Sequence, residues 1–326
     1  MSSRTGSHSH PLDSVTVESS GAVGAATPGR SRRPPLLLRL RVGIRPYVML
    51  APAFAFIGLI FLYSLGRLIY LSVHNGENGT TGRAQLDAYR FVLDDPIFQG
   101  AVKHNLLLLL SVPVVTVLAL AIALVLHDGI RGWRFYRTVV FLPYMLAIPV
   151  LGTTFALLLS LNGVFNSALD TIGLGVLRED WLGSPSFALG SVASIIIYHE
   201  LGFGVVLFLA RLLSLPEEVD QAARIDGCTW WQLRRRITLP QMRSVIIAFT
   251  VLEVTTMLSW VFAYVYSTTK GGPNFASYVL EFYIYDNAFP FRSPSFAAAA
   301  AVLLLIATTV LIVIQVRRTK VEVNLE

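Results

Sequence analysis

Long apolar stretches alternate with shorter polar ones along most of this chain. A helix needs about 20 residues to cross about 30 Å of hydrocarbon, and six apolar stretches reach that length. They are residues 47–71, 105–126, 138–160, 187–210, 244–266 and 295–316. Their apolar residues are continuous rather than alternating, which argues against a membrane-spanning β-barrel. The pattern therefore predicts an all-α integral membrane protein with a six-helix transmembrane bundle.

The flanking polar stretches complete the expected organisation. Residues 1–46 are rich in Ser, Gly, Pro and Arg and lack a periodic apolar pattern, which predicts a disordered basic tail. His8 and His10 lie in this tail, where a solvated segment is favoured over a metal site. Residues 47–316 form the predicted transmembrane domain, with a polar loop at 212–243, and residues 317–326 form a second tail.

Composition agrees with a membrane location. The 326 residues are 54% hydrophobic and 14% charged, whereas soluble domains carry about 25% charged residues. The net charge of +6 does not point to nucleic acid, because the arginines form short clusters between apolar stretches. A single cysteine, Cys228, excludes an internal disulfide, and a small loop residue is favoured over a reactive thiol.

The distribution of Lys and Arg predicts the orientation in the membrane. The two tails and the loops at 127–137 and 211–243 hold 19 of these residues, whereas the loops at 72–104, 161–186 and 267–294 hold 6. Cytoplasmic loops carry the excess of positive charge. Both termini and the long central loop are therefore expected on the cytoplasmic side.

The central loop has the pattern of two short helices. Ser214 followed by Glu217 is a capping-box spacing, and Thr229 followed by Gln232 repeats it. Gly227 lies between them and is expected to end the first helix, because glycine adopts the left-handed conformation at helix ends. An amphipathic helix on the membrane surface is the alternative, with arginines touching lipid phosphates. Four acids on the first helix oppose it as a complete explanation, although Arg224 and the arginines at 234–236 are candidates for lipid contact.

The same loop carries a family resemblance. Gln221-Ala222-Ala223, three residues, Gly227, nine residues and then Ile237-Thr-Leu-Pro240 resembles the EAA motif of ABC-importer permeases. Asp226 and Trp231 are similar to the carbohydrate-uptake branch, the maltose-type permeases, and the resemblance extends over about 47–316. The chain departs from the family pattern at Gln221, where the family has glutamate, and at Ala263, where it often has aspartate.

The resemblance implies a subunit of a larger transporter. It implies half of a translocation pathway for a sugar or related carbohydrate in a bacterial plasma membrane. The implied partners are a second permease that forms a heterodimer with this chain, an ABC ATPase dimer and an extracytoplasmic solute-binding protein. It implies that ATP and Mg²⁺ are held by the ATPase and that no cofactor or metal is held by this chain. The sequence agrees in having no phosphate-binding loop of the form G-x-x-x-x-G-K-[ST]. The residues assigned to ATPase coupling are Glu217, Glu218, Gln221, Ala222, Ala223, Asp226, Gly227, Ile237, Leu239 and Pro240.

Polar residues inside the predicted spans are candidates for the translocation pathway. Ionisable groups are costly in a membrane, so His199, Glu200 and Glu253 are functional candidates by default. Trp260 and Tyr264 follow on the fifth span, and aromatic faces pack against sugar rings. The alternatives are a buried hydrogen-bonded link between helices for the ionisable groups and an interfacial aromatic belt for the rings.

Two other classes of protein remain for comparison. A self-contained secondary transporter or channel would need an internal repeat and an intramembrane ion site, and the sequence shows neither clearly. A membrane-embedded enzyme would need clustered catalytic groups near one interface, for which His199 and Glu200 are too few. The leading prediction is therefore a non-enzymatic permease subunit.

Overall fold

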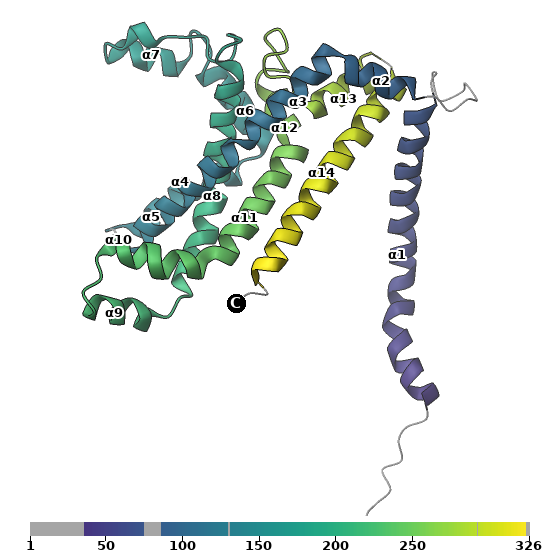
Figure 1. Ribbon diagram of the computed structural model, residues 1–326. Helices are drawn as coiled ribbons and strands as arrows, with labels where there is room; N and C mark the ends of the chain where they lie inside the picture. The colour runs from purple at the N-terminus through teal and green to yellow at the C-terminus, as the bar shows by residue number, and fades with distance from the viewer. Residues whose placement is uncertain (1–35, 75–85, 130, 292, 324–326) are drawn as a thin grey trace, which may run out of the picture. The chain divides into compact units, whose positions relative to one another are not determined.

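The computed structural model describes residues 36–74, 86–129, 131–291 and 293–323, and the regular structure in these ranges is helical (Figure 1). The helices are α1 (Leu36–Val73), α2 (Asp87–Asp94), α3 (Pro96–Leu109), α4 (Ser111–His127), α5 (Trp133–Phe141), α6 (Ile148–Leu158), α7 (Val164–Thr171), α8 (Ala188–Leu213), α9 (Glu217–Ile225), α10 (Trp230–Leu233), α11 (Leu239–Ser259), α12 (Val261–Thr268), α13 (Leu280–Ala288) and α14 (Pro294–Val323). Short 3₁₀ turns lie at Pro143–Met145 and Gly175–Leu177, and a π-helical turn at Arg234–Thr238. The all-α prediction is confirmed.

Five helical segments in the described ranges are long and apolar enough to cross a membrane, and a bent pair makes a sixth. The five are Leu50–Val73, Pro96–His127, Ala188–Leu213, Trp230–Ser259 and Pro294–Gln315. The bent pair is Trp133–Met145 with Ile148–Leu158, at an angle of 99°. Pro143 and Pro149 flank the bend, where the missing backbone N–H groups interrupt the helix. Each predicted span therefore has a counterpart, with the third one broken.

Three helix boundaries differ from the predicted ones. α1 begins at Leu36, within the predicted tail 1–46, and α14 continues to Val323; residues 1–35 and 324–326 lie outside the described residues. Leucine and arginine both favour helix, so the helix extends past the apolar edge that hydropathy detects. The fifth span ends at Ser259, and α12 follows it as a separate helix.

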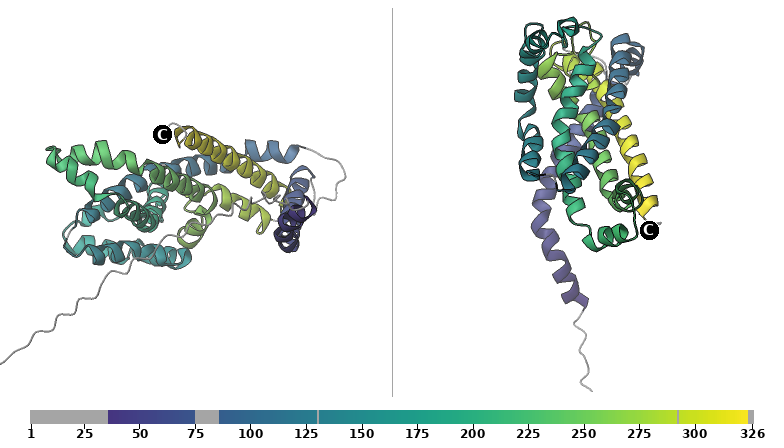
Figure 2. Two further views of the ribbon diagram at one scale, coloured as in Figure 1. Left: turned by 90° about the horizontal axis from the view of Figure 1, so that it is seen from below. Right: turned by 90° about the vertical axis from the view of Figure 1, so that its left-hand side faces the viewer.

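The helices after residue 59 form one compact unit, Ile60–Glu326, around α8. α8 packs along α4 and also contacts α5, α11 and α12, while α6 packs on α12 and α13 on α14. The long helices α8, α11 and α14 lie alongside one another in the right-hand view of Figure 2. At Gly204 on α8 a Cβ atom would lie 2.7 Å from side-chain atoms of Ala119 and Phe249. The close approach of α4, α8 and α11 therefore requires a glycine at this position.

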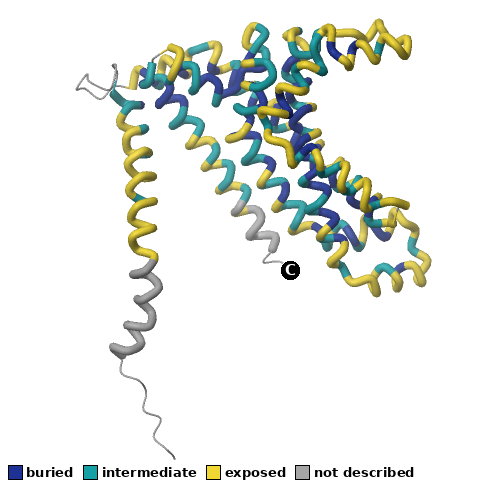
Figure 3. The backbone as a smooth tube through the Cα atoms, turned by 180° about the vertical axis from the view of Figure 1, so that it is seen from behind, coloured by how far each residue is buried: buried dark blue, intermediate teal, exposed yellow. Residues whose placement is uncertain are grey.

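The core of this unit has two apolar clusters. One joins residues of α3, α8, α12, α13 and α14, including Val192 and Val265; the other joins α4, α8 and α11, including Phe208 and Phe249. Buried residues lie inside the bundle, whereas the segment around α9 is mostly exposed (Figure 3). The two clusters follow one another along the length of α8.

The connecting segments of this unit gather at its two ends. α9 and α10 lie at one end, and α7 and α13 lie at the other (Figure 1). At the second end, the hairpin around α7 is fixed by the buried Asn166. The Nδ2 atom of Asn166 donates to the carbonyl oxygen of Glu179 over 2.8 Å, and its Oδ1 accepts from Trp181 Nε1 over 3.0 Å. Side-chain hydrogen bonds therefore hold this hairpin in a defined conformation.

Candidate functional site

A polar cluster inside the bundle joins α8 to α12. The hydroxyl of Tyr264 lies 2.8 Å from Glu200 Oε1 and 2.7 Å from His199 Nδ1, and His199 Nδ1 lies 3.1 Å from the same carboxylate oxygen. All three side chains are buried. Three of the five residues predicted for the pathway thus form one hydrogen-bonded group.

The broken third span supplies a fourth member of this group. His199 Nε2 lies 3.3 Å from the carbonyl oxygen of Leu146, which belongs to the bend before α6. The bend frees this carbonyl from helical hydrogen bonding, and backbone of this kind is tolerated at membrane depth where protein groups satisfy it. Because a carbonyl oxygen only accepts hydrogen bonds, Nε2 is the donor in this bond. Nδ1, on the other side of the ring, lies next to Tyr264 and Glu200. The cluster therefore holds the bend against α8.

Tyr144 belongs to this region and was missed by the sequence interpretation. Its ring lies 5.3 Å from the ring of His199 and 5.2 Å from that of Phe203, measured between centroids. Tyr144 directly follows Pro143 in the Phe-Leu-Pro pattern of the third span. A tyrosine directly after a proline inside a span was the sequence signal that could have identified Tyr144.

Glu253 on α11 lies close enough to Glu200 and Tyr144 to interact with them electrostatically. Its side chain is 1% exposed, and its Oε2 atom has no hydrogen-bond partner among the described residues. Along α8 and α11, Glu200 and Glu253 lie between the residues of the two apolar clusters. A buried carboxylate oxygen without a donor has free capacity to accept a hydrogen bond from a hydroxyl or a water molecule.

Trp260 differs from the other four pathway candidates because it lies at the surface. It joins α11 to α12 and is 62% exposed. Tyr264 follows one turn later on α12 and is fully buried. The structure therefore separates the candidates into one exposed ring and four buried polar groups.

The polar loop contains α9 and a sharp turn at its end. Gly227 has φ +77°, the left-handed conformation predicted for it, and Thr229 forms a capping box with Gln232. The capping prediction for Ser214 was wrong: α9 begins after Pro216 without a side-chain cap, and the Ser214 hydroxyl donates to the Arg211 carbonyl. Pro216 moves the helix start away from Ser214, because proline fits the N-terminus of a helix.

The second helix of the loop is continuous with the fifth span. α10 leads through the π-helical turn at Arg234–Thr238 directly into α11, so Ile237, Leu239 and Pro240 lie on one helical path into the membrane. The prediction of two separate short helices is therefore corrected to one short helix and an extension of α11. A proline at the start of α11 is compatible with this path, because the π-helical turn already interrupts the regular backbone bonding.

Most loop residues assigned to coupling are available at the surface. Ala223 is buried at 5% exposure, and Ile237 and Leu239 are half-buried. Exposed are Glu217, Glu218, Gln221, Ala222, Asp226, Gly227 and Pro240. Ile225 beside them is 86% exposed and Trp231 is 63% exposed. The surface of α9 thus combines acidic and large apolar side chains.

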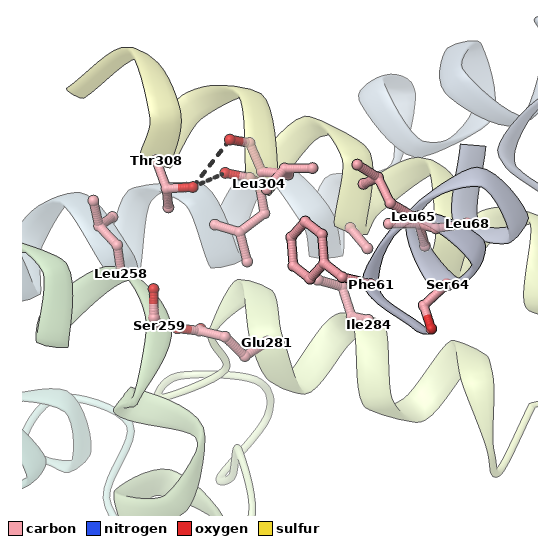
Figure 4. Close-up of a pocket in the computed structure, with 12 residues that line it drawn as sticks. Phe61, Ser64, Leu65, Leu68, Leu258, Ser259, Glu281, Ile284, Leu304 and Thr308 are labelled. Atoms are coloured by element: carbon pink, nitrogen blue, oxygen red, sulfur yellow. Dashed lines mark hydrogen bonds between the residues drawn. The ribbon is translucent and has the colours of Figure 1, made fainter. Parts of the chain in front are cut away.

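A cavity of about 530 Å³ lies between α1, α11, α13 and α14 in the unit Ile60–Glu326. Figure 4 shows Phe61 reaching into it from α1, with Ser259 and Glu281 at one side. Glu281 Oε2 accepts from Asn105 Nδ2 over 3.3 Å, whereas its buried Oε1 has no partner among the described residues. Burial raises the pKa of the Glu281 carboxyl to about 7. The cavity is apolar except for this acid and a few hydroxyls.

Comparison with known proteins matches nearly the whole helical part. Residues 46–321 match the model of the family described as binding-protein-dependent transport system inner membrane component. A probable ABC transporter permease of Pyrococcus horikoshii is 32% identical over 257 residues, covering 75% of this chain and 85% of the relative. The lactose transport system permease of Rhizobium radiobacter is 29% identical over 264 residues, covering 78% and 86%.

Solved structures agree with this assignment. A bacterial ABC transporter that imports the acidic polysaccharide alginate contains a chain with a TM-score of 0.75 and 25% identity, covering 86% of this chain and 98% of that one. The chain therefore belongs to the family of binding-protein-dependent transport system inner membrane components, the permease subunits of ABC importers.

Proposed function

We propose that this permease imports a carbohydrate or a related polyol. The observation that carries the proposal is the similarity over three quarters of the chain to a permease named for lactose, together with the fold shared with an alginate importer. The buried polar cluster supports it, because sugar hydroxyls both donate and accept hydrogen bonds. The alternative of a self-contained secondary transporter or channel has no comparable support.

Within this chain, we propose that Trp260 meets the sugar and that the buried polar groups shape the pathway beside it. The exposed ring of Trp260 offers an apolar face to the C–H face of a pyranose. Glu253 supplies a free acceptor for a hydroxyl, and His199, Glu200 and Tyr264 hold the bend in place. We expect the sugar to contact the ring of Trp260 first and to form a hydrogen bond with Glu253 afterwards.

The ATPase contact is proposed on α9. α9 is a short helix that ends at the turn of Gly227, and it exposes acidic side chains and Ile225. Such a protruding helix fits an apolar cleft with basic residues at its edge. Interfaces concentrate binding energy in a few large apolar side chains surrounded by polar ones. ATP and Mg²⁺ are proposed to bind to the ATPase dimer.

A second permease, different in sequence, is proposed to complete the pathway and to cover the cavity beside Glu281. A carboxyl oxygen without a partner is costly at the edge of a membrane helix bundle, and a neighbouring helix can satisfy it. Ser64, Ser259 and Ala301 in the lining are small, which suits close helix contact.

The location follows from the charge distribution. We propose a multi-pass protein of the bacterial plasma membrane with α9 and both termini in the cytoplasm, since Lys and Arg are enriched on that side. The hairpin around α7 and the segment before α13 then face outward, where a solute-binding protein docks. The rigid framework of Asn166 and Trp181 supports such a docking surface.

Two experiments test this proposal. Purification in mild detergent from the native host should yield an ATPase and a second permease with this chain; uptake by the chain alone in proteoliposomes without ATP would contradict it. For the sugar contact, a panel of radiolabelled mono- and disaccharides is tested with the reconstituted complex. Trp260→Ala should raise KM for the transported sugar about tenfold, and Trp260→Phe should raise it less, because phenylalanine keeps a ring face. Equal KM values in the parent and Trp260→Ala would remove Trp260 from the pathway.

A further inference from the structure

Arg234 occupies a buried site under the cytoplasmic loop. Its side chain is 2% exposed and is among the largest fully buried side chains in the described structure. The neighbouring Arg235 and Arg236 are exposed. The expectation that the arginines at 234–236 contact lipid is therefore wrong for Arg234, because the π-helical turn that begins with it directs it inward.

The partners of Arg234 come from two other segments. Its Nη2 donates to Asp128 Oδ1 in the turn between α4 and α5, and its Nη1 donates to Asp220 Oδ2 on α9 over 3.3 Å. Nη1 also lies 3.2 Å from the hydroxyl of Thr238. The second oxygen of Asp128 accepts from Trp230 Nε1 over 2.6 Å. One guanidinium group therefore joins α9, the start of α11 and the α4–α5 turn.

The chemistry of this contact suits a clamp. A guanidinium presents donors in a fixed planar fork and reaches two carboxylates at once, which a lysine ammonium on a flexible stem does less well. Removal of Arg234 would leave Asp128 and Asp220 near each other without a counter-charge. The side chains of Asp128 and Asp220 are each 26% exposed, so the expected effect is repulsion between two like charges and a looser contact.

The connections of the loop to the spans decide what the Arg234 contact does. The loop is covalently joined only to α8 at one end and to α11 at the other. Arg234 adds a non-covalent link to α4, the helix that packs along α8. Trp230 also bonds Asp128, but Arg234 is the residue that bonds both Asp128 and Asp220 of α9.

We propose that Arg234 is a positioning residue that fastens α9 to the α4–α5 turn, so that α4, α8 and α11 move together when the ATPase displaces α9. This inference rests on the proposed coupling function of α9. Asp128 lies outside the loop and gains a role in this proposal. Through Arg234, a displacement of α9 would move α4 as well as α8 and α11.

The test measures a distance across the clamp. Cys228 is the single cysteine, so a second one at the exposed Arg131 (Arg131→Cys) permits two nitroxide labels on the loop and the α4–α5 turn. Pulsed electron resonance gives the distance distribution in the isolated chain, and in the complex with ATP and in its vanadate-trapped form. The parent should show one narrow distribution in all three samples. Arg234→Met should widen it about twofold in the isolated chain, because two uncompensated carboxylates then repel, and should shift it with nucleotide in the complex.

Controls separate the clamp from general damage. Arg235→Met removes an exposed arginine one residue away and should leave the distribution narrow. Arg234→Lys should give an intermediate width, because one ammonium group replaces the fork. If Arg234→Met does not fold, Asp128→Asn serves instead: it keeps Arg234 paired with Asp220 and should loosen only the link to α4.

The outcomes distinguish the two proposals. An unchanged narrow distribution in Arg234→Met or Asp128→Asn would overturn the clamp, as would a parent whose distance already shifts with nucleotide. If no ATPase binds the parent chain, the proposed coupling function fails, whereas the widths in the isolated chain still decide whether Arg234 fixes the loop.

Discussion

Tyr264 on α12 donates its hydroxyl hydrogen to Glu200 on α8 across 2.8 Å, inside the helix bundle. The two residues are 64 positions apart in the sequence. Their contact ties α12, the helix after the fifth span, to α8, the span that precedes the polar loop. It also places a carboxylate, an imidazole and a phenol in one group.

The first prediction concerns this hydroxyl. Tyr264→Phe should lower stability by about 1–3 kcal/mol, because Glu200 and His199 each lose a partner in a buried site. The measurement is the thermal unfolding midpoint of the chain in detergent. Tyr198→Phe is the matched control, since Tyr198 is on α8 and 47% exposed. Equal midpoints for both variants would show that the hydroxyl adds nothing.

The second prediction concerns Glu253. Glu253→Ala should weaken sugar uptake without loss of complex assembly, because it removes the free acceptor while leaving the cluster of His199, Glu200 and Tyr264 intact. Glu253→Gln keeps a carbonyl acceptor and should retain more uptake than the alanine variant. Initial uptake rates over a range of sugar concentrations decide the point. Unchanged kinetics in Glu253→Ala would make this residue a structural one.

The third prediction concerns the turn after α9. Gly227→Leu should leave the protein inserted but uncouple ATP hydrolysis from uptake, because a side chain at φ +77° costs about 1–2 kcal/mol and distorts the turn. No heavy atom lies within 4 Å of the added Cβ position, so backbone strain rather than a clash is being tested. Gly227→Asn is the control, since asparagine tolerates this conformation. Normal uptake per ATP in Gly227→Leu would refute the role of the turn.

The fourth prediction concerns pH. Burial raises the pKa of Glu281 from 4.5 to about 7 in the folded chain, so the folded state holds this proton more tightly than the unfolded one. The resulting stabilisation is fully present below pH 4.5 and is lost as pH rises to about 7. The unfolding midpoint of the isolated chain should therefore decrease as pH rises from 4.5 to about 7, and Glu281→Gln should flatten that dependence. If the unfolding midpoints of the parent and Glu281→Gln change with pH in the same way, a group other than Glu281 causes the dependence.

Several features of the loop could be predicted because they depend on neighbouring residues. The left-handed turn at Gly227 and the capping box of Thr229 follow from local backbone hydrogen bonding. The cap at Ser214 was predicted by the same rule and was wrong, because Pro216 provides a better helix start. The continuation of α10 into α11 was also missed, since a π-helical turn has no simple sequence pattern.

The candidate site was predicted only in part for a different reason. Hydropathy identified His199, Glu200 and Glu253 as unusual in their spans, but not which of them would meet. Tyr144 and the Leu146 carbonyl entered the site through the 99° bend, whose angle depends on packing between helices. Arg234 was expected at the surface, but its partner Asp128 lies more than a hundred residues earlier in the chain, so no local pattern predicts its burial.

The six apolar segments, the two sets of loops that differ in Lys and Arg content and the turn at Gly227 follow from the amino-acid sequence alone, because hydrophobic length, loop charge and local backbone bonding decide these features. The tertiary structure alone decided that Tyr264 meets Glu200, that Glu253 keeps a free oxygen and that Arg234 is buried. Such contacts depend on the rotation and height of each helix within the bundle. These are fixed by the combined packing of many side chains, and no single segment encodes them.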